Sequence, residues 1–122
     1  MLLTARSADQ LEQLSAQLSS KGASVASVAI DLTQPDAIAA AMAGLLQQGE
    51  TPSVLINNAG AAYTGELLDM PIERWQWLLQ LNVTSVMQVC AAVVPAMREN
   101  GGLVINTSSH AANGGRGISF AA

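Results

Sequence analysis

The chain has 122 residues, enough for one domain with a modest hydrophobic core. Half of its residues are hydrophobic and only 11% are charged, which excludes intrinsic disorder, because disordered chains combine low hydrophobicity with high net charge. The formal charge of −4 at pH 7 and the five scattered Lys and Arg residues argue against a nucleic-acid partner, since phosphate binding needs clustered basic side chains.

The first part of the chain predicts a strand and then a helix. Leu2–Ala5 is a short apolar strand candidate. Ser7 and Gln10 have the spacing of a capping box at a helix start, and Gly22 is a residue type that commonly ends a helix. Between them, three leucines at helical spacing mark a face that we expect to be buried: Leu11, Leu14 and Leu18.

A second strand and a second helix follow. Ser24 to Ile30 is rich in β-forming residues. Thr33 and Pro35 begin a helix whose apolar residues fall on one face: Ile38, Met42, Leu45 and Leu46. The next strand, Val54 to Ile56, is wholly apolar, which is typical of a strand covered on both faces of its sheet.

The rest of the chain predicts two helical regions and one more strand. Asp69 and Pro71 open the first region, because proline is tolerated in the first turn of a helix. The helix from Val83 to Met97 is apolar nearly all round, so we expect it to be buried against the sheet and against a partner subunit. Leu103 to Asn106 is the fourth strand, and the Gly-rich segment 113–122 has no clear period.

Strands separated by helices of this length imply right-handed crossovers. The sequence therefore predicts an α/β fold, part of a doubly wound parallel sheet of about four strands with flanking helices. No apolar run approaches the ~18–20 residues that span a bilayer, and the long apolar helix contains Gln88 and Pro95, so we expect no membrane partner. The N-terminus lacks the pattern of a secretory signal, which favours a cytoplasmic protein.

Two charged residues follow the first two strands, at the edge where such sheets bind ligands. Arg6 can pair bidentately with the 2′-phosphate of an adenosine ribose, or it is a solvated surface arginine. Asp31, followed by Leu32, can accept a hydrogen bond from an adenine amino group, and a loop aspartate beside a helix is an equally good interpretation.

Two polar motifs follow the last two strands. Asn57-Asn58-Ala59-Gly60 combines amides with small residues, so its backbone can approach a cofactor, and Gly60 can adopt positive φ. Asn106-Thr107-Ser108-Ser109 places a hydroxyl that can donate to a carbonyl or alcohol oxygen. Taken singly, each motif is also compatible with an ordinary turn or a polar strand end.

Together with Asp31-Leu32 and Leu81-Asn82-Val83, these motifs occur in an order and spacing that resembles the short-chain dehydrogenase/reductase superfamily. The resemblance covers residues 2 to about 112. It implies that residues 1–122 form part of an NAD(P)-binding Rossmann domain. It also implies an oxidoreductase that transfers a hydride between NADP(H), or less readily NAD(H), and a small carbonyl or alcohol substrate.

The resemblance assigns the cofactor-binding residues one by one. Arg6 matches a basic residue of members that prefer NADP, and Asp31 and Leu32 match the pair that contacts adenine. The residues that match the element lining the cofactor and steadying the sheet are Asn58, Ala59 and Gly60.

The resemblance also assigns two catalytic residues. Asn82 matches an asparagine that holds a water of the proton relay, and Ser109 matches the serine that orients the substrate oxygen. His110 is the only histidine, and we expect it to line the pocket or to be exposed rather than to act as a base. Tyr63 lies in the wrong place to match the catalytic tyrosine. No metal site is expected.

Two motifs of the family are not found in the chain: the Thr-Gly-x-x-x-Gly-x-Gly turn that meets the pyrophosphate, and the Tyr-x-x-x-Lys pair. We therefore expect the isolated chain to be inactive, whereas a complete protein would form a homo-oligomer through the long apolar helix. The alternatives are a non-catalytic nucleotide-binding relative and a truncated or frameshifted gene remnant.

The family's first strand would lie between Leu2–Ala5 and Val54–Ile56, and without it a gap of about two strand spacings, ~9–10 Å, separates them. The strand edges beside the gap are apolar and prone to aggregation, so we expect residues 1–122 alone to fold poorly.

Overall fold

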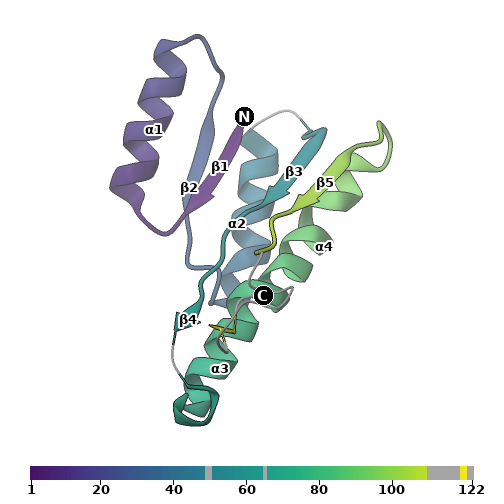
Figure 1. Cartoon of the computed structure of the whole chain (residues 1–122). Coiled ribbons are helices and arrows are strands. Elements are labelled where there is room, and N and C mark those ends of the chain that lie inside the picture. Colours follow the sequence, from purple (N-terminus) through teal and green to yellow (C-terminus); the bar gives the residue numbers. More distant parts are fainter. Residues whose placement is uncertain (49–50, 65, 110–118, 121–122) are drawn as a thin grey trace.

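The computed structural model describes residues 1–48, 51–64, 66–109 and 119–120 (Figure 1). The architecture is α/β, as expected. The elements are β1 (Leu2–Ala5), α1 (Ala8–Ser20), β2 (Ala26–Ala29), α2 (Pro35–Gln48), β3 (Val54–Asn57), β4 (Tyr63–Thr64), η1 (Leu67–Asp69), α3 (Ile72–Leu79), η2 (Gln80–Thr84), α4 (Ser85–Met97), β5 (Leu103–Asn106) and β6 (Ser119–Phe120).

The strands form two parallel ladders rather than one continuous sheet. β1 pairs with β2, with Leu2 opposite Ala26, and β3 pairs with β5, with Val54 opposite Leu103. Among the described residues, no ladder joins β1 to β3. The expected parallel direction is confirmed, and the absence of a ladder agrees with the gap that the family resemblance implies.

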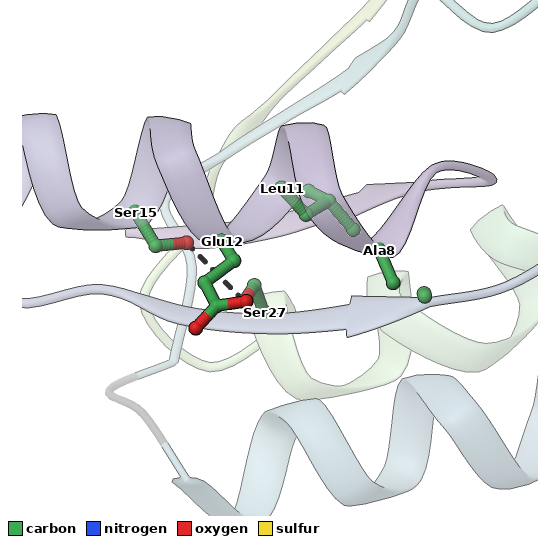
Figure 2. A pocket seen from close by; sticks show the side chains of 6 residues that line it. Ala8, Leu11, Glu12, Ser15 and Ser27 are labelled. Carbon is green, nitrogen blue, oxygen red and sulfur yellow. Dashed lines mark hydrogen bonds between the residues drawn. The ribbon is translucent and has the colours of Figure 1, made fainter.

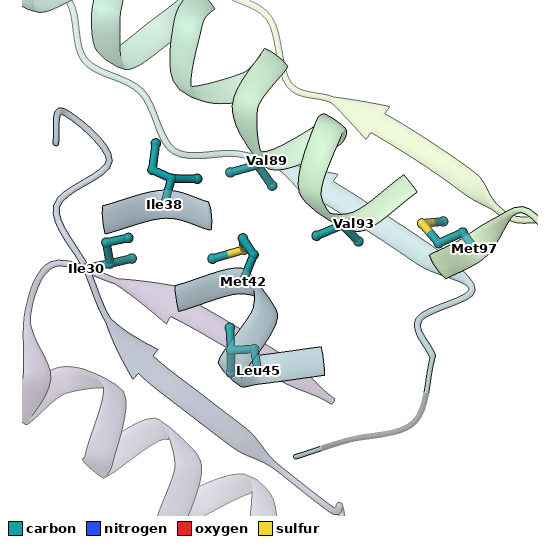
Figure 3. Close-up of a cluster of buried hydrophobic side chains, with 7 residues drawn as sticks. All are labelled: Ile30, Ile38, Met42, Leu45, Val89, Val93 and Met97. Atoms are coloured by element: carbon teal, nitrogen blue, oxygen red, sulfur yellow. The ribbon is translucent and has the colours of Figure 1, made fainter. Parts of the chain in front are cut away.

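The hydrophobic core lies between α2, α4 and the end of β2 (Figure 3). The expected buried face of α2 is confirmed for three residues: Ile38, Met42 and Leu45. They meet the buried side chains of α4, which are Val89, Val93 and Met97, and Ile30 completes the cluster from the end of β2. This packing fixes α4, and with it one wall of the site described below, against the rest of the chain.

One face of the β3–β5 ladder is exposed. Side chains alternate along a strand, so the observed register places four apolar residues on the same face: Val54, Ile56, Leu103 and Ile105. All four are exposed, and Ile56 reaches 60%. The expectation that Val54 to Ile56 is covered on both faces is therefore wrong for the described chain, because the core touches only the face that carries Leu55.

Helix α1 packs beside β2, at the margin of the fold. Ser7 caps it by accepting a hydrogen bond from the Gln10 N–H at 3.3 Å, and Gly22 ends it with φ of 88°. Leu11 is buried, but Leu14 is 43% exposed, contrary to expectation, because only the β1–β2 ladder covers this helix. Figure 2 shows the seam between α1 and β2, where the Ser15 hydroxyl donates to Ser27 Oγ at 3.2 Å.

The two helical regions that the sequence predicts, one opening at Pro71 and one from Val83 to Met97, form a single helix. It runs without interruption over Ile72–Met97, 26 residues, and passes through α3, η2 and α4. It has the length and mean hydropathy of a membrane-spanning segment, so its length is no argument against one. Core helices of soluble proteins pass the same test; 28% of the apolar window is buried, and α4 packs against α2.

Two short strands have no counterpart in the sequence-based prediction. β4 pairs antiparallel with β6, with Tyr63 opposite Phe120 and Thr64 opposite Ser119. Each has only two residues, too few to give a periodic signal in a sequence.

Candidate active site

A hollow of about 520 Å³ lies at the carboxyl ends of β3 and β5. It is lined by residues 57–62 after β3, residues 106–109 after β5, and residues 82–83 and 86–87 of the long helix. The carboxyl ends of parallel strands meet at one edge of a sheet, so the polar motifs that follow β3 and β5 come together there. Five of the predicted site residues line this hollow: Asn58, Ala59, Gly60, Asn82 and Ser109.

Asn57 ties the ends of the two strands together. Its Nδ2 donates to Asn106 Oδ1 at 2.9 Å, and its backbone carbonyl accepts from the Thr107 N–H at 3.0 Å. The same Nδ2 lies 3.4 Å from Cys90 Sγ on α4. The sequence indicated the Asn57 motif but no separate role for its first asparagine, which here links the ends of β3 and β5 to α4.

Asn82 joins the long helix to the loop after β3. Its Oδ1 accepts from the Ala61 N–H at 2.9 Å, and its Nδ2 donates to the Ala61 carbonyl at 2.8 Å. Both ends of the carboxamide are therefore used by one residue of the loop. One N–H of the amide group and one lone pair of its oxygen stay available for a further ligand.

A glycine is needed at position 60 because a side chain there would be too close to Asn82, and not because of the backbone conformation. Among the described glycines only Gly22 and Gly101 have positive φ, so Gly60 does not use its capacity for positive φ here. A Cβ at Gly60 would instead lie 3.1 Å from Asn82 Oδ1. The glycine lets the loop approach the Asn82 carboxamide, 22 positions along the chain.

Ser109 and the serine beside it line the hollow. The residues after β5, from Thr107 to Ser109, are exposed, as are Asn58 and Ala59 across from them. Val83 and Met87 supply an apolar wall from the long helix, and both are exposed. The hollow thus presents amides and hydroxyls on one side and an apolar wall on the other.

The remaining three predicted residues form a second group, at the carboxyl ends of β1 and β2. Arg6 is exposed, and its charge acts on Asp31 across the ladder. The Asp31 carboxylate accepts from the Thr33 N–H at 2.9 Å and from its hydroxyl at 2.8 Å. These two bonds lower the pKa of Asp31. Burial opposes them, and the charge of Arg6 adds a smaller lowering effect, so Asp31 is ionised at neutral pH. Leu32 packs against the core and lies partly buried.

Neither His110 nor Tyr63 is placed at the hollow by the described residues. His110 lies outside the described residues. Tyr63 lies in β4 and does not line the hollow. Among the described residues, no group of three or more His, Cys, Asp or Glu side chains could hold a metal ion.

The residues that line the hollow can bind a polar molecule and polarise one of its oxygen atoms. Its described lining consists of Asn, Ala, Gly, Val, Met, Thr and Ser residues. These side chains can hold a polar molecule and donate hydrogen bonds to an oxygen. None of them exchanges a proton readily near neutral pH, so a general acid or base has to come from outside this lining.

Comparison with known proteins agrees with this geometry. Residues 1–121 match the family model for short chain dehydrogenase. The chain is 38% identical over 111 residues to serine 3-dehydrogenase of Rhizobium radiobacter, covering 90% of this chain and 43% of that protein. The chain therefore spans less than half the length of this relative.

Two solved structures share the fold closely. L-sorbose reductase from Gluconobacter frateurii, complexed with NADPH and L-sorbose, matches with a TM-score of 0.85 and 29% identity over 91% of this chain and 43% of that one. A metagenomic short-chain oxidoreductase in complex with NADP matches with a TM-score of 0.87 and 33% identity over 95% of this chain and 53% of that one.

Proposed function

The chain belongs to the short-chain dehydrogenase family, and from this premise we propose that the complete protein transfers a hydride between NADP(H), or NAD(H), and a small carbonyl or alcohol substrate. One observation carries the proposal: Asn58, Asn82 and Ser109 line one hollow at the carboxyl ends of β3 and β5. In open α/β sheets, this edge is where cofactors and substrates bind.

The residues present fit the two ends of a dinucleotide. Arg6 and Asp31, at the ends of β1 and β2, offer a cation for a 2′-phosphate and an acceptor for an adenine amino group. The loop from Asn58 to Gly60 and the hollow beside it offer room and amides for the nicotinamide end. When bound, the nicotinamide supplies the hydride chemistry. NADP is preferred over NAD because Arg6 is suited to the extra phosphate, and the two solved relatives hold NADPH or NADP.

The chain's own residues position the loop beside the hollow and polarise the substrate oxygen. Ser109 donates a hydrogen bond to the substrate oxygen, which stabilises the charge that develops there. Asn82 holds the loop at Ala61 through its carboxamide and meets a water of the proton relay through its main chain. The described residues that line the hollow include no general acid or base, so we expect residues 1–122 by themselves to show no meaningful turnover.

We also propose that the complete protein is cytoplasmic and self-associates through the long helix. Two apolar side chains of this helix are exposed and lie outside the lining of the hollow: Ile72 and Leu79. A second copy that packs there would bury them. Nucleic acid and membrane are not proposed as partners.

A comparison of NADPH with NADH tests the proposal. We expect the chain to bind NADPH weakly, on the order of millimolar, and NADH more weakly still. Arg6→Ala should reduce NADPH binding to the NADH level and leave NADH binding unchanged, while Arg98→Ala, on the far end of α4, serves as the charge-matched control. If the wild-type chain binds NADPH and NADH with the same affinity, or if Arg6→Ala leaves the NADPH affinity unchanged, the NADP assignment is contradicted. NADPH-dependent carbonyl reduction above that of Ser109→Ala would contradict the expected inactivity of the chain.

A further inference from the structure

The long helix widens just where it reaches the hollow. Residues Gln80–Thr84 form a π-helical turn, and the N–H of Ser85 bonds to the Gln80 carbonyl, five residues back. In an α-helix this N–H would bond to the Leu81 carbonyl, four residues back. In this wider turn the Ser85 N–H therefore bonds to the Gln80 carbonyl, and the Leu81 carbonyl loses the backbone donor that an α-helix would give it.

The side chain of Ser85 takes the place of that donor. Its Oγ donates to the Leu81 carbonyl at 2.6 Å. Ser85 is 1% exposed and is the one buried polar residue in the part of the chain that the structure describes. Water cannot easily replace a hydroxyl in such a place, and a buried carbonyl without a donor is unfavourable.

The π turn determines where Asn82 points. Each residue of an α-helix adds about 100° of rotation and 1.5 Å of rise. If the turn relaxed to an α-helix, the residues before it would shift by about one residue relative to α4. Asn82, which lies inside the turn, would then lose the geometry that joins its carboxamide to both backbone groups of Ala61.

We propose that Ser85 is a positioning residue: its hydroxyl holds the π turn open and thereby keeps Asn82 bonded to the loop that carries Asn58 to Gly60. The Ser85 hydroxyl bonds to the Leu81 carbonyl in the turn, the turn orients Asn82, and Asn82 bonds to Ala61. Ser85 does not line the hollow, so it acts only through Asn82. Its relevance to hydride transfer rests on the proposed function, whereas the positioning itself does not.

An ordinary serine in a helix would not have this role. Serine hydroxyls often bond to the carbonyl one turn back, in addition to the backbone bond. Ser20 is such a case, since its Oγ donates to the Gln17 carbonyl at 2.8 Å at the exposed end of α1. Ser85 differs because its own N–H has moved to Gln80, so the hydroxyl replaces a backbone donor. Ser20→Ala is therefore the matched control.

Hydrogen exchange of single amides tests this chain of contacts without any need for turnover. In Ser85→Ala, we expect the Ala61 N–H to exchange about tenfold faster, because it loses its bond to Asn82. The Leu103 N–H, which donates to the Ser53 carbonyl at 2.9 Å, should keep its exchange rate. Ser20→Ala should leave both rates unchanged. A general loss of stability would raise both rates together, and that result would overturn the proposal.

A second pair of variants covers the case in which Ser85→Ala does not fold. Threonine and valine have nearly the same shape, but only threonine keeps the hydroxyl. We expect the Ala61 N–H to exchange about tenfold more slowly in Ser85→Thr than in Ser85→Val. Equal exchange in the two variants, or an unprotected Ala61 N–H in the wild-type chain, would overturn the proposal. Nucleotide binding is a separate measurement, so its failure would count against the proposed function alone.

Discussion

The carboxamide of Asn82 is bonded at both ends to the main chain of Ala61, with an N–H···Oδ1 distance of 2.9 Å and an Nδ2···O distance of 2.8 Å. The two residues are 21 positions apart, and one lies in a helix and the other in a loop. This pair closes one side of the hollow at the carboxyl ends of β3 and β5. Its integrity is the first property to test.

Asn82→Asp should break this pair. The substitution removes the Nδ2 donor and directs a carboxylate oxygen at the Ala61 carbonyl. We expect the free energy of unfolding to fall by about 1–3 kcal/mol, because a partly buried acceptor loses its donor. Urea unfolding followed by Trp fluorescence measures this change. Asn58→Asp, at an exposed position beside the same hollow, is the control and should change stability by less than about 0.5 kcal/mol. Equal effects of the two substitutions would contradict the account.

Gly60→Ala should destabilise the chain, although alanine usually stabilises a backbone. The new Cβ would lie 3.1 Å from Asn82 Oδ1, and that oxygen is held by the Ala61 N–H, so it has little freedom to move. We expect a loss of about 1–3 kcal/mol from overpacking, measured by urea unfolding.

The control for that substitution has the opposite expected sign. Gly44 lies inside α2, and a Cβ there would meet nothing within 4 Å. Gly44→Ala should therefore stabilise the chain by up to about 1 kcal/mol, the difference in helix propensity. The prediction fails if Gly60→Ala is neutral or stabilising while Gly44→Ala behaves as expected.

Thr33→Val should raise the pKa of Asp31. The Thr33 N–H and hydroxyl are the main causes that hold this pKa below its ordinary value of 3.8, with Arg6 a smaller one, and valine removes the hydroxyl. A lowered pKa in the folded state means that ionised Asp31 stabilises the fold above pH 3.8, and that this stability is lost as the pH falls through the lowered pKa. Carboxyl NMR titration should show a higher Asp31 pKa in Thr33→Val, and an unchanged value would contradict the assignment.

Polar substitutions on the exposed face of the β3–β5 ladder should reduce aggregation without unfolding the chain. Ile56 and Ile105 lie opposite each other on this face, and both are exposed. For the double substitution Ile56→Thr with Ile105→Thr, we expect a larger monodisperse fraction by light scattering and a stability change within about 0.5 kcal/mol per site. Leu55→Thr, on the core face of β3, should instead cost about 1–3 kcal/mol. Loss of stability in the double variant as large as in Leu55→Thr would show that the face is covered.

The sequence predicts the elements well where a local pattern carries the information. The apolar runs predict four strands and their parallel order, and the 3.6-residue period predicts the buried face of α2. The motifs after β3 and β5 predict the meeting of Asn58 and Ser109, because parallel strands bring their carboxyl ends together, whereas Asn82 is placed beside them only by the family resemblance.

The remaining features depend on distant partners. Ile56 and Leu14 are as apolar as buried residues, and their exposure follows only from what packs on them. The π turn at Gln80–Thr84 has no residue pattern of its own, and it becomes meaningful only through the bond of Ser85 to Leu81. Position 60 has to be a glycine because Asn82 lies close to it, and the sequence of the loop alone does not indicate that contact.

The most direct test of the proposed nicotinamide site is an amide chemical-shift map of the isotope-labelled chain during titration with NADPH. We expect the shifts to concentrate at residues 58–62, 82–87 and 106–109, with a second group near Arg6 and Asp31. Shifts confined to other parts of the chain, or none at millimolar NADPH, would contradict the proposed site.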